Sequence, residues 1–475
     1  MLKNSLKILS IFTILIAITN TIFAKGKKTP GVNWHTGTVE SAFAIAKKKN
    51  MPIFLYWGAT WCPPCNQIKK TIFTKKEFKK EMNHFIAVYL DGDEKRAQTW
   101  GEKLGAKGYP TMIVLNSRGE EVTRMPSGLK IKGYISLLKK ARRQDQTIQS
   151  LLTLLDKDNL TSGQWSILAN YSWEQDHHLQ ETFLAKENKL KNFTMLYNKA
   201  PKRYKSSFFF RIASMPEKDL KKKESYRAYL LKLLKDKAIV NQNLETIAYS
   251  SSVIAKNLQT DKKDHTIQKA VITAMNSYRK DQRLTADELL ITYIPRLTFF
   301  ELDQGEKYKV SKNFKATLQK VVKDIEKNVQ DKYARHSALT TSVWMLMTAN
   351  MTTEAKELAL REVKTSPHAY YYMSYLTSID FKLKNNKDAL SWSKKGWELS
   401  KGPATRFQWG YSYLSNLLKH SKKDASQIQT TYKLIMDEYK KSELPDAGRN
   451  KRILAKLKKK IKAWNKKNPK KKVKL

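Results

Sequence analysis

The hydrophobic pattern of this 475-residue chain changes once, near Gln144, and that change constrains the fold more than any other feature. Before it, short apolar runs alternate with helical spacings, which indicates strands and helices arranged in layers. After it, the β-branched runs disappear, and segments rich in Leu, Lys, Tyr and Ala keep helical spacing to the C-terminus. The sequence therefore predicts an α/β domain over residues 33–143, an all-helical region over residues 144–464 and a basic tail over residues 465–475.

Short apolar runs separated by turn signals define the elements expected in the α/β domain. The predicted strands are Met51–Trp57, Phe85–Leu90, Thr111–Asn116 and an edge-like strand, Glu121–Arg124. The predicted helices are Val39–Lys49, a helix that starts at residue 62 and continues to about Phe73, Thr99–Leu104 and Ile131–Arg142. Strands and helices that alternate in this way predict an α/β sandwich.

The first residues of the chain have the pattern of a secretory signal peptide. Two lysines precede an apolar stretch over Ile8–Ile18, and the segment closes on Ile22-Phe23-Ala24 before a basic stretch. The apolar stretch is shorter than the ~20 residues that a membrane helix needs. We therefore expect a signal peptide over residues 1–24, a linker over residues 25–32 and a periplasmic or secreted protein. An uncleaved N-terminal anchor is less favoured, although Ile22 is larger than the residue that signal cleavage prefers.

The chain carries a large positive charge, with 90 Lys and Arg against 43 Asp and Glu, for a formal net charge of +47. Such a charge attracts anionic partners, but solvated lysines on helix faces are the favoured interpretation, and nucleic acid is disfavoured as a partner. Residues 451–475 contain no acid and carry an apolar stripe of Ile453, Leu454, Leu457, Ile461 and Trp464. A helix that caps the helical region is favoured there, with contact to an anionic membrane surface as the alternative.

All the cysteine in this chain lies in one motif, Trp61-Cys62-Pro63-Pro64-Cys65. The motif follows a predicted buried strand and opens a predicted helix, so the first thiol lies at a helix N-terminus and the second lies one turn later. There the helix dipole and free N–H groups favour a thiolate at Cys62, the candidate nucleophile. Cys65, more enclosed by the helix, is the candidate that attacks the mixed disulfide and releases the product. The predicted centre is a redox-active disulfide without a further cofactor.

Other interpretations of the cysteine pair are a structural disulfide and half of a metal site. A zinc site needs further ligands, and the sequence has no second cysteine pair to supply them, so no metal site is predicted. The two prolines bear on the direction of electron flow. Pro63 and Pro64 have no N–H, so a Cys62 thiolate loses donors that other residues would provide, and the couple becomes more reducing. This favours reduction or isomerisation of disulfides over primary oxidation.

The order of these elements resembles that of the thioredoxin superfamily. A strand, Ile53–Trp57, leads into the C-x-x-C motif, and Gly108-Tyr109-Pro110-Thr111 precedes the strand Met112–Leu115. The resemblance implies a cis-proline at Pro110, beside the nucleophile, where the preceding backbone pairs with an extended substrate. The residues expected to shield the motif or to position substrate are Trp61, Pro63, Pro64, Tyr109 and Pro110.

Three further segments look like the subgroup of periplasmic thioredoxin-like proteins and the C-terminal domain of transmembrane thiol:disulfide interchange proteins. They are Thr71-Ile72-Phe73, Glu77-Phe78 and Val88–Asp93. One position departs from the family pattern, because thioredoxins proper have a buried carboxylate six residues before the nucleophile and this chain has Tyr56 there. Glu40, Asp91 and Asp93 are the acids near the motif in sequence, and we interpret each as solvated surface.

In the helical region, Ala355 and Ala389 stand 34 positions apart, and they are followed by Pro367 and Pro403. The spacing resembles that of tetratricopeptide-type helical hairpins, in which small alanines allow close packing and a proline ends the second helix. Since the full motif is absent, we expect an irregular helical solenoid. The aromatic runs over 208–210 and 370–372 are interpreted as helix core rather than as stacking platforms.

The motif, its setting and the expected export lead to the expectation of a thiol–disulfide oxidoreductase that acts on cysteine-containing exported proteins. A membrane thiol–disulfide electron donor is a candidate partner, and the helical region is expected to bind substrate or partner. The main alternative is a scaffold, binding or chaperone-like protein in which the helical region is the working part and the redox pair is secondary. A peroxide-linked thiol enzyme is less favoured, because the chain has no third cysteine.

Overall fold

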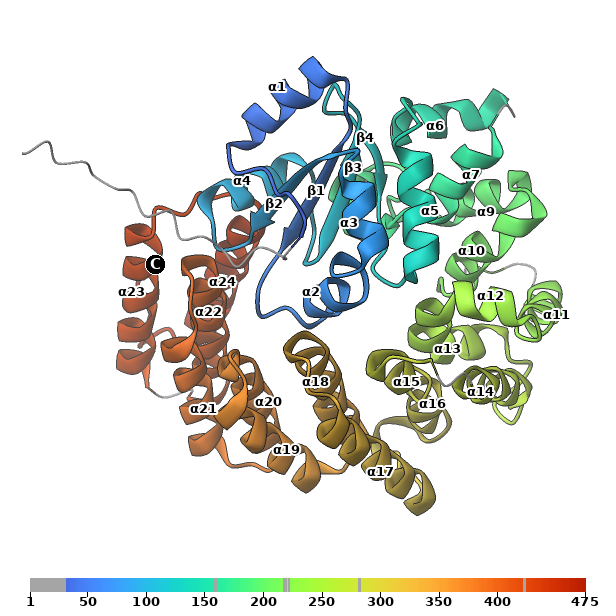
Figure 1. Ribbon diagram of the computed structural model, residues 1–475. Helices are drawn as coiled ribbons and strands as arrows, with labels where there is room; N and C mark the ends of the chain where they lie inside the picture. The colour runs from blue at the N-terminus through green and yellow to red at the C-terminus, as the bar shows by residue number, and fades with distance from the viewer. Residues whose placement is uncertain (1–30, 158–159, 217–219, 221–222, 281–282, 422–423) are drawn as a thin grey trace, which may run out of the picture.

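The computed structural model describes residues 31–157, 160–216, 220, 223–280, 283–421 and 424–475. The predicted signal peptide and most of the predicted linker lie outside these ranges. The described part consists of a four-stranded α/β domain and a long helical region that follows it. Figure 1 shows the helices leaving one side of the sheet, passing beneath it in an arc and returning to its other side.

The sheet contains strands β1 (Ile53–Gly58), β2 (Ile86–Asp91), β3 (Thr111–Leu115) and β4 (Glu121–Arg124), in the order β2-β1-β3-β4. β1 and β2 are parallel, whereas β3 is antiparallel to both of its neighbours. Every residue of β1 is buried, because helices cover both faces of the sheet, and this explains the continuous apolar run of its sequence. All four strands lie within two residues of their predicted bounds, which confirms the expected sandwich.

The helices of this domain are α1 (Val39–Lys49), α2 (Pro63–Ile68), α3 (Lys76–Met82), α4 (Lys95–Lys103) and α5 (Ile131–Ala141). α1 and α4 share a core with one face of the sheet, and α2, α3 and α5 share a core with the other. The sequence pattern missed α3 and placed the start of α4 four residues late. The helix that opens at the motif ends as an α-helix at Ile68 and continues as a π-helical turn, Lys69–Phe73.

After α5, the elements within the described residues are all helices, which confirms the predicted all-helical region. The first set is α6 (Ile148–Leu154), α7 (Ser162–Ala169), α8 (His177–Glu181), α9 (Lys189–Lys199), α10 (Lys202–Ala213), α11 (Lys223–Leu233), α12 (Lys237–Gln242), α13 (Leu244–Leu258), α14 (Thr266–Arg279), α15 (Ala286–Ile291) and α16 (Ile294–Gln304). The second set is α17 (Lys312–Asn328), α18 (Lys332–Thr348), α19 (Thr352–Thr365), α20 (Ala369–Lys382), α21 (Asn386–Leu399), α22 (Pro403–His420), α23 (Ala425–Lys441) and α24 (Gly448–Lys467).

Burial in these helices agrees with the core interpretation of the aromatic runs, with one exception. Phe208, Phe209 and Phe210 are buried, as are Tyr370 and Tyr372. The residue between the last two, at position 371, is only half-buried. Its ring lies beside the redox motif, as described below.

The helical region contacts the α/β domain at several places, and three of them hold its beginning, its middle and its end. α18 packs on α2, α24 packs on α4, and the segment between α7 and α8 contacts the end of β4. Figure 1 shows α18 below α2, and α24 beside α4 at the far end of the arc. The helical region is therefore held by the α/β domain near its beginning, in its middle and at its end.

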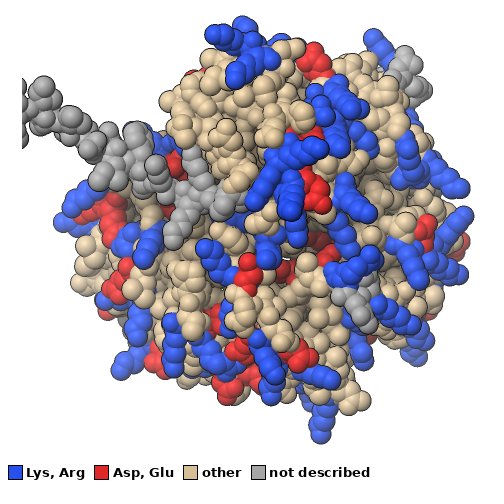
Figure 2. Space-filling model, viewed as in Figure 1, with Lys and Arg blue, Asp and Glu red and all other residues tan. Residues whose placement is uncertain are grey.

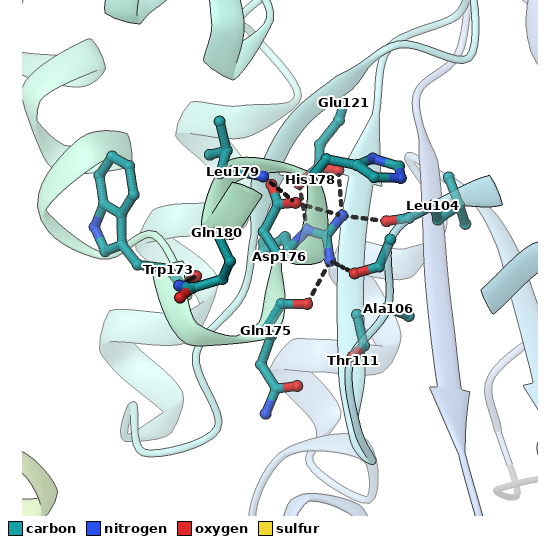
Figure 3. Close-up of polar contacts among 12 residues, drawn as sticks. Leu104, Ala106, Thr111, Glu121, Trp173, Gln175, Asp176, His178, Leu179 and Gln180 are labelled. Atoms are coloured by element: carbon teal, nitrogen blue, oxygen red, sulfur yellow. Dashed lines mark hydrogen bonds and ion pairs between the residues drawn. The ribbon is translucent and has the colours of Figure 1, made fainter. Parts of the chain in front are cut away.

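A buried arginine fixes the contact at β4. Arg124 is 1% exposed and forms ion pairs with Glu121 at 2.7 Å and with Asp176 at 3.7 Å. Its guanidinium also donates to the backbone carbonyls of Gln175, at 2.7 Å, and Leu104. Figure 3 shows Glu121, Asp176, Gln175 and Leu104 turned towards this common centre. Because a buried cation is stable only when it is paired and hydrogen-bonded, this network holds the start of the helical region against β4.

The apolar stripe of α24 faces the interior. The buried side chains of this stripe are Ile453, Leu454, Leu457, Ile461 and Trp464. α24 packs on α22 and α4, so it closes the end of the helical region as predicted. Beyond the helix, the backbone of Val473 is hydrogen-bonded to the Asn465 side chain, and the Val473 side chain is buried.

Basic side chains are spread over the face of the molecule that Figure 2 presents. Figure 2 shows lysine and arginine on all parts of the visible face, with acidic side chains among them rather than a single basic patch. This distribution agrees with the interpretation of the charge as solvated helix faces. Among the described helices, none combines the length and the apolar character that a membrane crossing requires.

Candidate functional site

The two cysteines lie at the start of α2 and are joined by a disulfide. Cys62 is the N-cap residue, and its Sγ accepts a hydrogen bond from the backbone N–H of Cys65 at 3.2 Å. Pro63 and Pro64 suit the next positions, because the first N–H groups of a helix have no carbonyl partner within the helix. Both sulfurs are enclosed, since Cys62 is 3% exposed and Cys65 is fully buried. The structure thus has the first sulfur at the helix N-terminus and the second one turn later.

The loop before β3 lies against the motif. Its Tyr109–Pro110 peptide bond is cis, as the resemblance implies. The Tyr109 ring contacts the rings of Trp61 and Trp57, with centroids 6.0 and 4.3 Å apart, and its hydroxyl accepts a hydrogen bond from Gln98 at 3.2 Å. The structure therefore brings Tyr109 and Pro110, predicted from sequence order, to the same place as the cysteines.

The helical region covers the motif through Trp61. The backbone carbonyl of Trp61 accepts a hydrogen bond from His336 Nε2 at 2.8 Å, and its indole N–H donates to Thr405 Oγ1 at 2.7 Å. The rings of Trp409 and Tyr371 pack on the indole, with centroids 4.9 and 6.0 Å away. Side chains from α20 and α22 thus form one apolar cluster with the cysteines, and the ring of His336, from α18, contacts that of Tyr371. Trp61 was predicted to be part of the site, whereas the residues of the helical region that contact it were not.

Two neighbouring histidines of the helical region, close to the side chains that cover the motif, are neutral at pH 7. Burial lowers the pKa of His336 to about 4 and that of His368 to about 3, and their ring centroids lie 5.2 Å apart. A carbonyl oxygen can only accept, so Nε2 of His336 carries the proton donated to Trp61. Nδ1 of His336 is buried and has no hydrogen-bond partner within the described residues. The contact with the motif therefore uses the uncharged imidazole.

A second chain of hydrogen bonds runs from the motif to an acid that follows β2. Thr405, which accepts from Trp61, donates to Asp93 through its hydroxyl at 2.9 Å and through its backbone N–H at 2.7 Å. Burial, with a smaller contribution from the charge of Asp91, raises the pKa of Asp93 to about 7. The interpretation of Asp91 and Asp93 as solvated surface is wrong, because Asp91 is 8% exposed and α22 covers Asp93. Glu40 is exposed, as expected.

Tyr56 occupies the position where a buried carboxylate would serve as a proton relay. Its hydroxyl has no hydrogen-bond partner within the described residues, and burial raises its pKa far above the ordinary value. The phenol therefore stays protonated and supplies no base. Its ring stacks on that of Tyr89, whose hydroxyl donates to Asp91 at 3.1 Å. Parallel pairing of β1 with β2 is what brings this acid towards the motif, and that pairing is the signal from which it could have been predicted.

Comparison with known families matches residues 39–142 to the thioredoxin-like domain. The first part of this chain is a thioredoxin-like domain. The match contains both cysteines and Pro110, and it ends before the helical region. No curated protein matches the chain, and no solved structure matches it either. A thioredoxin-like domain with a Cys62–Cys65 disulfide supports a thiol–disulfide oxidoreductase. The part of the chain that the structure describes has no group of three or more His, Cys, Asp or Glu placed to hold a metal ion.

Proposed function

We propose that this protein is an exported thiol–disulfide oxidoreductase that reduces or isomerises disulfides of cysteine-containing exported proteins. The observation that carries the proposal is the Cys62–Cys65 disulfide at the N-terminus of α2, within a thioredoxin-like domain and beside the Tyr109–Pro110 loop. Export rests on the sequence of residues 1–24. The helical region, which contacts the motif directly, is the proposed site for substrate or partner.

The reduction of a substrate disulfide has two steps. The Cys62 thiolate attacks one sulfur of a substrate disulfide, so a Cys62–substrate bond forms, the substrate bond breaks, and the leaving sulfur departs as a thiolate. The Cys65 thiolate then attacks Cys62 Sγ, the Cys62–Cys65 bond forms, and the second substrate sulfur is released as a thiolate. The substrate gains two electrons, and the cysteine pair loses two. A dithiol donor, for which a membrane thiol–disulfide electron donor is the candidate, reduces the pair again.

The hydrogen-bond donors around Cys62 favour the reducing direction. Cys65 offers one N–H to the first sulfur, at 3.2 Å, whereas Pro63 and Pro64 offer none. A thiolate with few donors is weakly stabilised, so the reduced pair gives up electrons more readily than a pair with a fully solvated thiolate. The same argument supports isomerisation, which also begins with attack by Cys62.

The test compares the reduced wild-type protein with the Cys62→Ser and Cys65→Ser variants. We expect wild type to reduce a small uncharged disulfide, and Cys62→Ser to lose that activity. Cys65→Ser should retain attack but not release, so that mixed disulfides on Cys62 accumulate in the native compartment and are identified by mass spectrometry. Unchanged activity in Cys62→Ser, or no activity in wild type, contradicts the proposal.

The cover over the motif favours a second candidate, a scaffold or chaperone-like protein in which the helical region does the work. His336 and Thr405 hold Trp61 in place, and the sulfur beside it is almost fully enclosed. A scaffold needs no free thiol, so Cys62→Ser with Cys65→Ser would leave its biological function intact. An oxidoreductase would lose its function in the same double variant.

A further inference from the structure

Two hollows open beside the redox motif, on the side of the helical region that faces the thioredoxin-like domain. The larger has a volume of about 550 Å³ and lies between α20, α21, α22 and the first turn of α24. Its aromatic walls are Trp61, Tyr371, Tyr375, Phe381, Trp392 and Trp409. Serine, threonine, asparagine and glutamine side chains lie between these rings, and no acidic residue lines the space.

The smaller hollow, of about 210 Å³, shares Tyr371 and Tyr375 with the larger one. Its other walls are Pro63, Pro64, Tyr249, Thr340, Thr341 and Trp344. Trp61 lines the larger hollow and Pro63 lines the smaller, so the chain places Cys62 between the two. A ligand that occupies both hollows passes the first cysteine of the motif.

One cation borders the larger hollow, and no carboxylate of the described residues pairs with it. Arg449, in the first turn of α24, lies over the rings of Tyr109 and Trp61, at 5.1 and 5.9 Å from their centroids. Its Nε is buried and has no hydrogen-bond partner within the described residues. Burial lowers the pKa of the guanidinium, which means that enclosure disfavours its charge. An anion that enters the hollow would offset that cost.

We propose that the two hollows hold an extended segment of a substrate protein across the redox motif, with Arg449 binding an acidic side chain near the substrate cysteine. This inference rests on the proposed function and specifies its substrate. The preferred substrate is a cysteine with aspartate or glutamate close to it, in an unfolded or flexible stretch of an exported protein.

The lining suits a polypeptide better than a compact anion. Side chains such as Ser374, Gln408 and Asn416 offer both donors and acceptors to the backbone of an extended chain, and the aromatic rings offer surface to its side chains. A small anion would occupy only part of one hollow, whereas an extended chain, which rises about 3.3 Å per residue, can enter both. The net charge of +47 also draws acidic segments towards the protein.

The Tyr371 side chain blocks access from the two hollows to Cys62. It lines both hollows and packs on Trp61, so its ring must turn aside before a segment can reach Cys62. Unlike its neighbours Tyr370 and Tyr372, which are buried, Tyr371 is half-buried and faces the open space. The position of the Tyr371 ring explains why the Cys62 sulfur is enclosed although two open hollows lie beside it.

The test measures binding without chemistry. The probe is a fluorescein-labelled nonapeptide with a central S-methylated cysteine and an aspartate three residues away, compared with the same peptide carrying asparagine. Fluorescence anisotropy is recorded on the full wild-type chain, on Arg449→Gln, on Arg449→Lys and on a matched control, Arg361→Gln. Arg361 lies at an exposed position of α19 and pairs with Glu326 of α17. Its replacement by glutamine removes one positive charge, as Arg449→Gln does.

We expect wild type and Arg361→Gln to bind the aspartate peptide at least about tenfold more tightly than the asparagine peptide. Arg449→Gln should bind both peptides equally, and Arg449→Lys should keep part of the difference. Ser374→Trp, which fills the larger hollow from its exposed rim, should weaken the binding of both peptides. Circular dichroism verifies that each variant is folded.

Three results would overturn the inference: equal binding of the two peptides by wild type, retained discrimination in Arg449→Gln, or displacement by free N-acetylaspartate at the concentration at which the nonapeptide itself displaces the probe. The last would identify a small-anion site. Since the blocked peptide cannot react, loss of exchange activity contradicts the proposed function and leaves the binding result intact. Normal exchange without charge discrimination contradicts only the substrate inference.

Discussion

His336 and Trp61 stand 275 positions apart in the sequence, and the imidazole of one donates a hydrogen bond to the backbone carbonyl of the other at 2.8 Å. The bond joins α18 to the residue that precedes Cys62. Because it is buried and uses a neutral imidazole, a change in its protonation should affect both the stability of the protein and access to the disulfide.

Acid should weaken this contact. The pKa of His336 is about 4 in the folded protein against an ordinary value of 6.5, so the unfolded chain takes up the proton first. Stability from this group is complete above pH 6.5 and is lost as the pH falls towards 4, by up to about 3 kcal/mol. Urea unfolding of wild type and His336→Gln near pH 7.5 and near pH 4.5 measures the loss. The advantage of wild type should shrink in acid, and a constant advantage would rule out this titration.

The titration of Asp93 should change the stability of the protein with pH in the opposite direction. Its pKa is about 7 in the folded protein against an ordinary value of 3.8, so the folded state holds the proton more tightly. Stability from this group is present below pH 3.8 and is lost as the pH rises towards 7. Asp93→Asn should therefore lose less stability than wild type between pH 4 and pH 8 in thermal unfolding. Asp388→Asn, at an exposed position of α21, should follow wild type throughout.

Removing the hydroxyl of Thr405 should expose the motif. Thr405 accepts from the Trp61 indole and donates to Asp93, and valine of similar size leaves both without that partner. In the reduced protein, we expect a bulky maleimide to alkylate Cys62 about tenfold faster in Thr405→Val than in wild type. Thr365→Val, at an exposed position of α19, is the matched control. Equal rates in the two variants would show that Thr405 does not hold the cover.

Arg124→Met should destabilise the whole protein. The change leaves Glu121 and Asp176 near each other without their cation, in a place where Arg124 is almost fully buried. The expected loss in the free energy of unfolding is about 3–5 kcal/mol, from chemical denaturation at neutral pH. Arg118→Met removes an exposed arginine that pairs with Asp145, and we expect no measurable loss there. Similar losses in both variants would mean that the Arg124 network does not join the two regions.

The part of the site within the thioredoxin-like domain was predictable because its elements follow one another along the chain. Cys62 and Cys65 stand between a continuous apolar run and a helix, and Pro110 directly precedes the next strand. Local pattern therefore suffices for these residues. His336 and Arg449 belong to helices whose own sequences show only helical spacing. Their place beside the motif depends on how the arc of helices bends back, which periodicity does not encode.

The burial of the acids near the motif could not be predicted from local sequence either. Asp91 and Asp93 follow a strand in a polar stretch, and such residues are mostly solvated. In the structure, Asp91 is the buried last residue of β2, and Asp93 is covered by Thr405 and its helix, more than 300 positions later in the chain. By contrast, the stripe of α24 was predictable, because five apolar residues at helical spacing need a partner surface wherever the helix lies.

The contact of α24 with α4 has a kinetic consequence. The helical region is anchored at both ends, so the side chains that cover the disulfide stay close to it even when they move away from the motif. A tether of this kind holds those side chains at a millimolar local concentration. A dissolved thiol or disulfide has to compete with that concentration. Small dissolved redox compounds should therefore exchange electrons with the cysteine pair more slowly than partners that bind the helices as well as the sulfur.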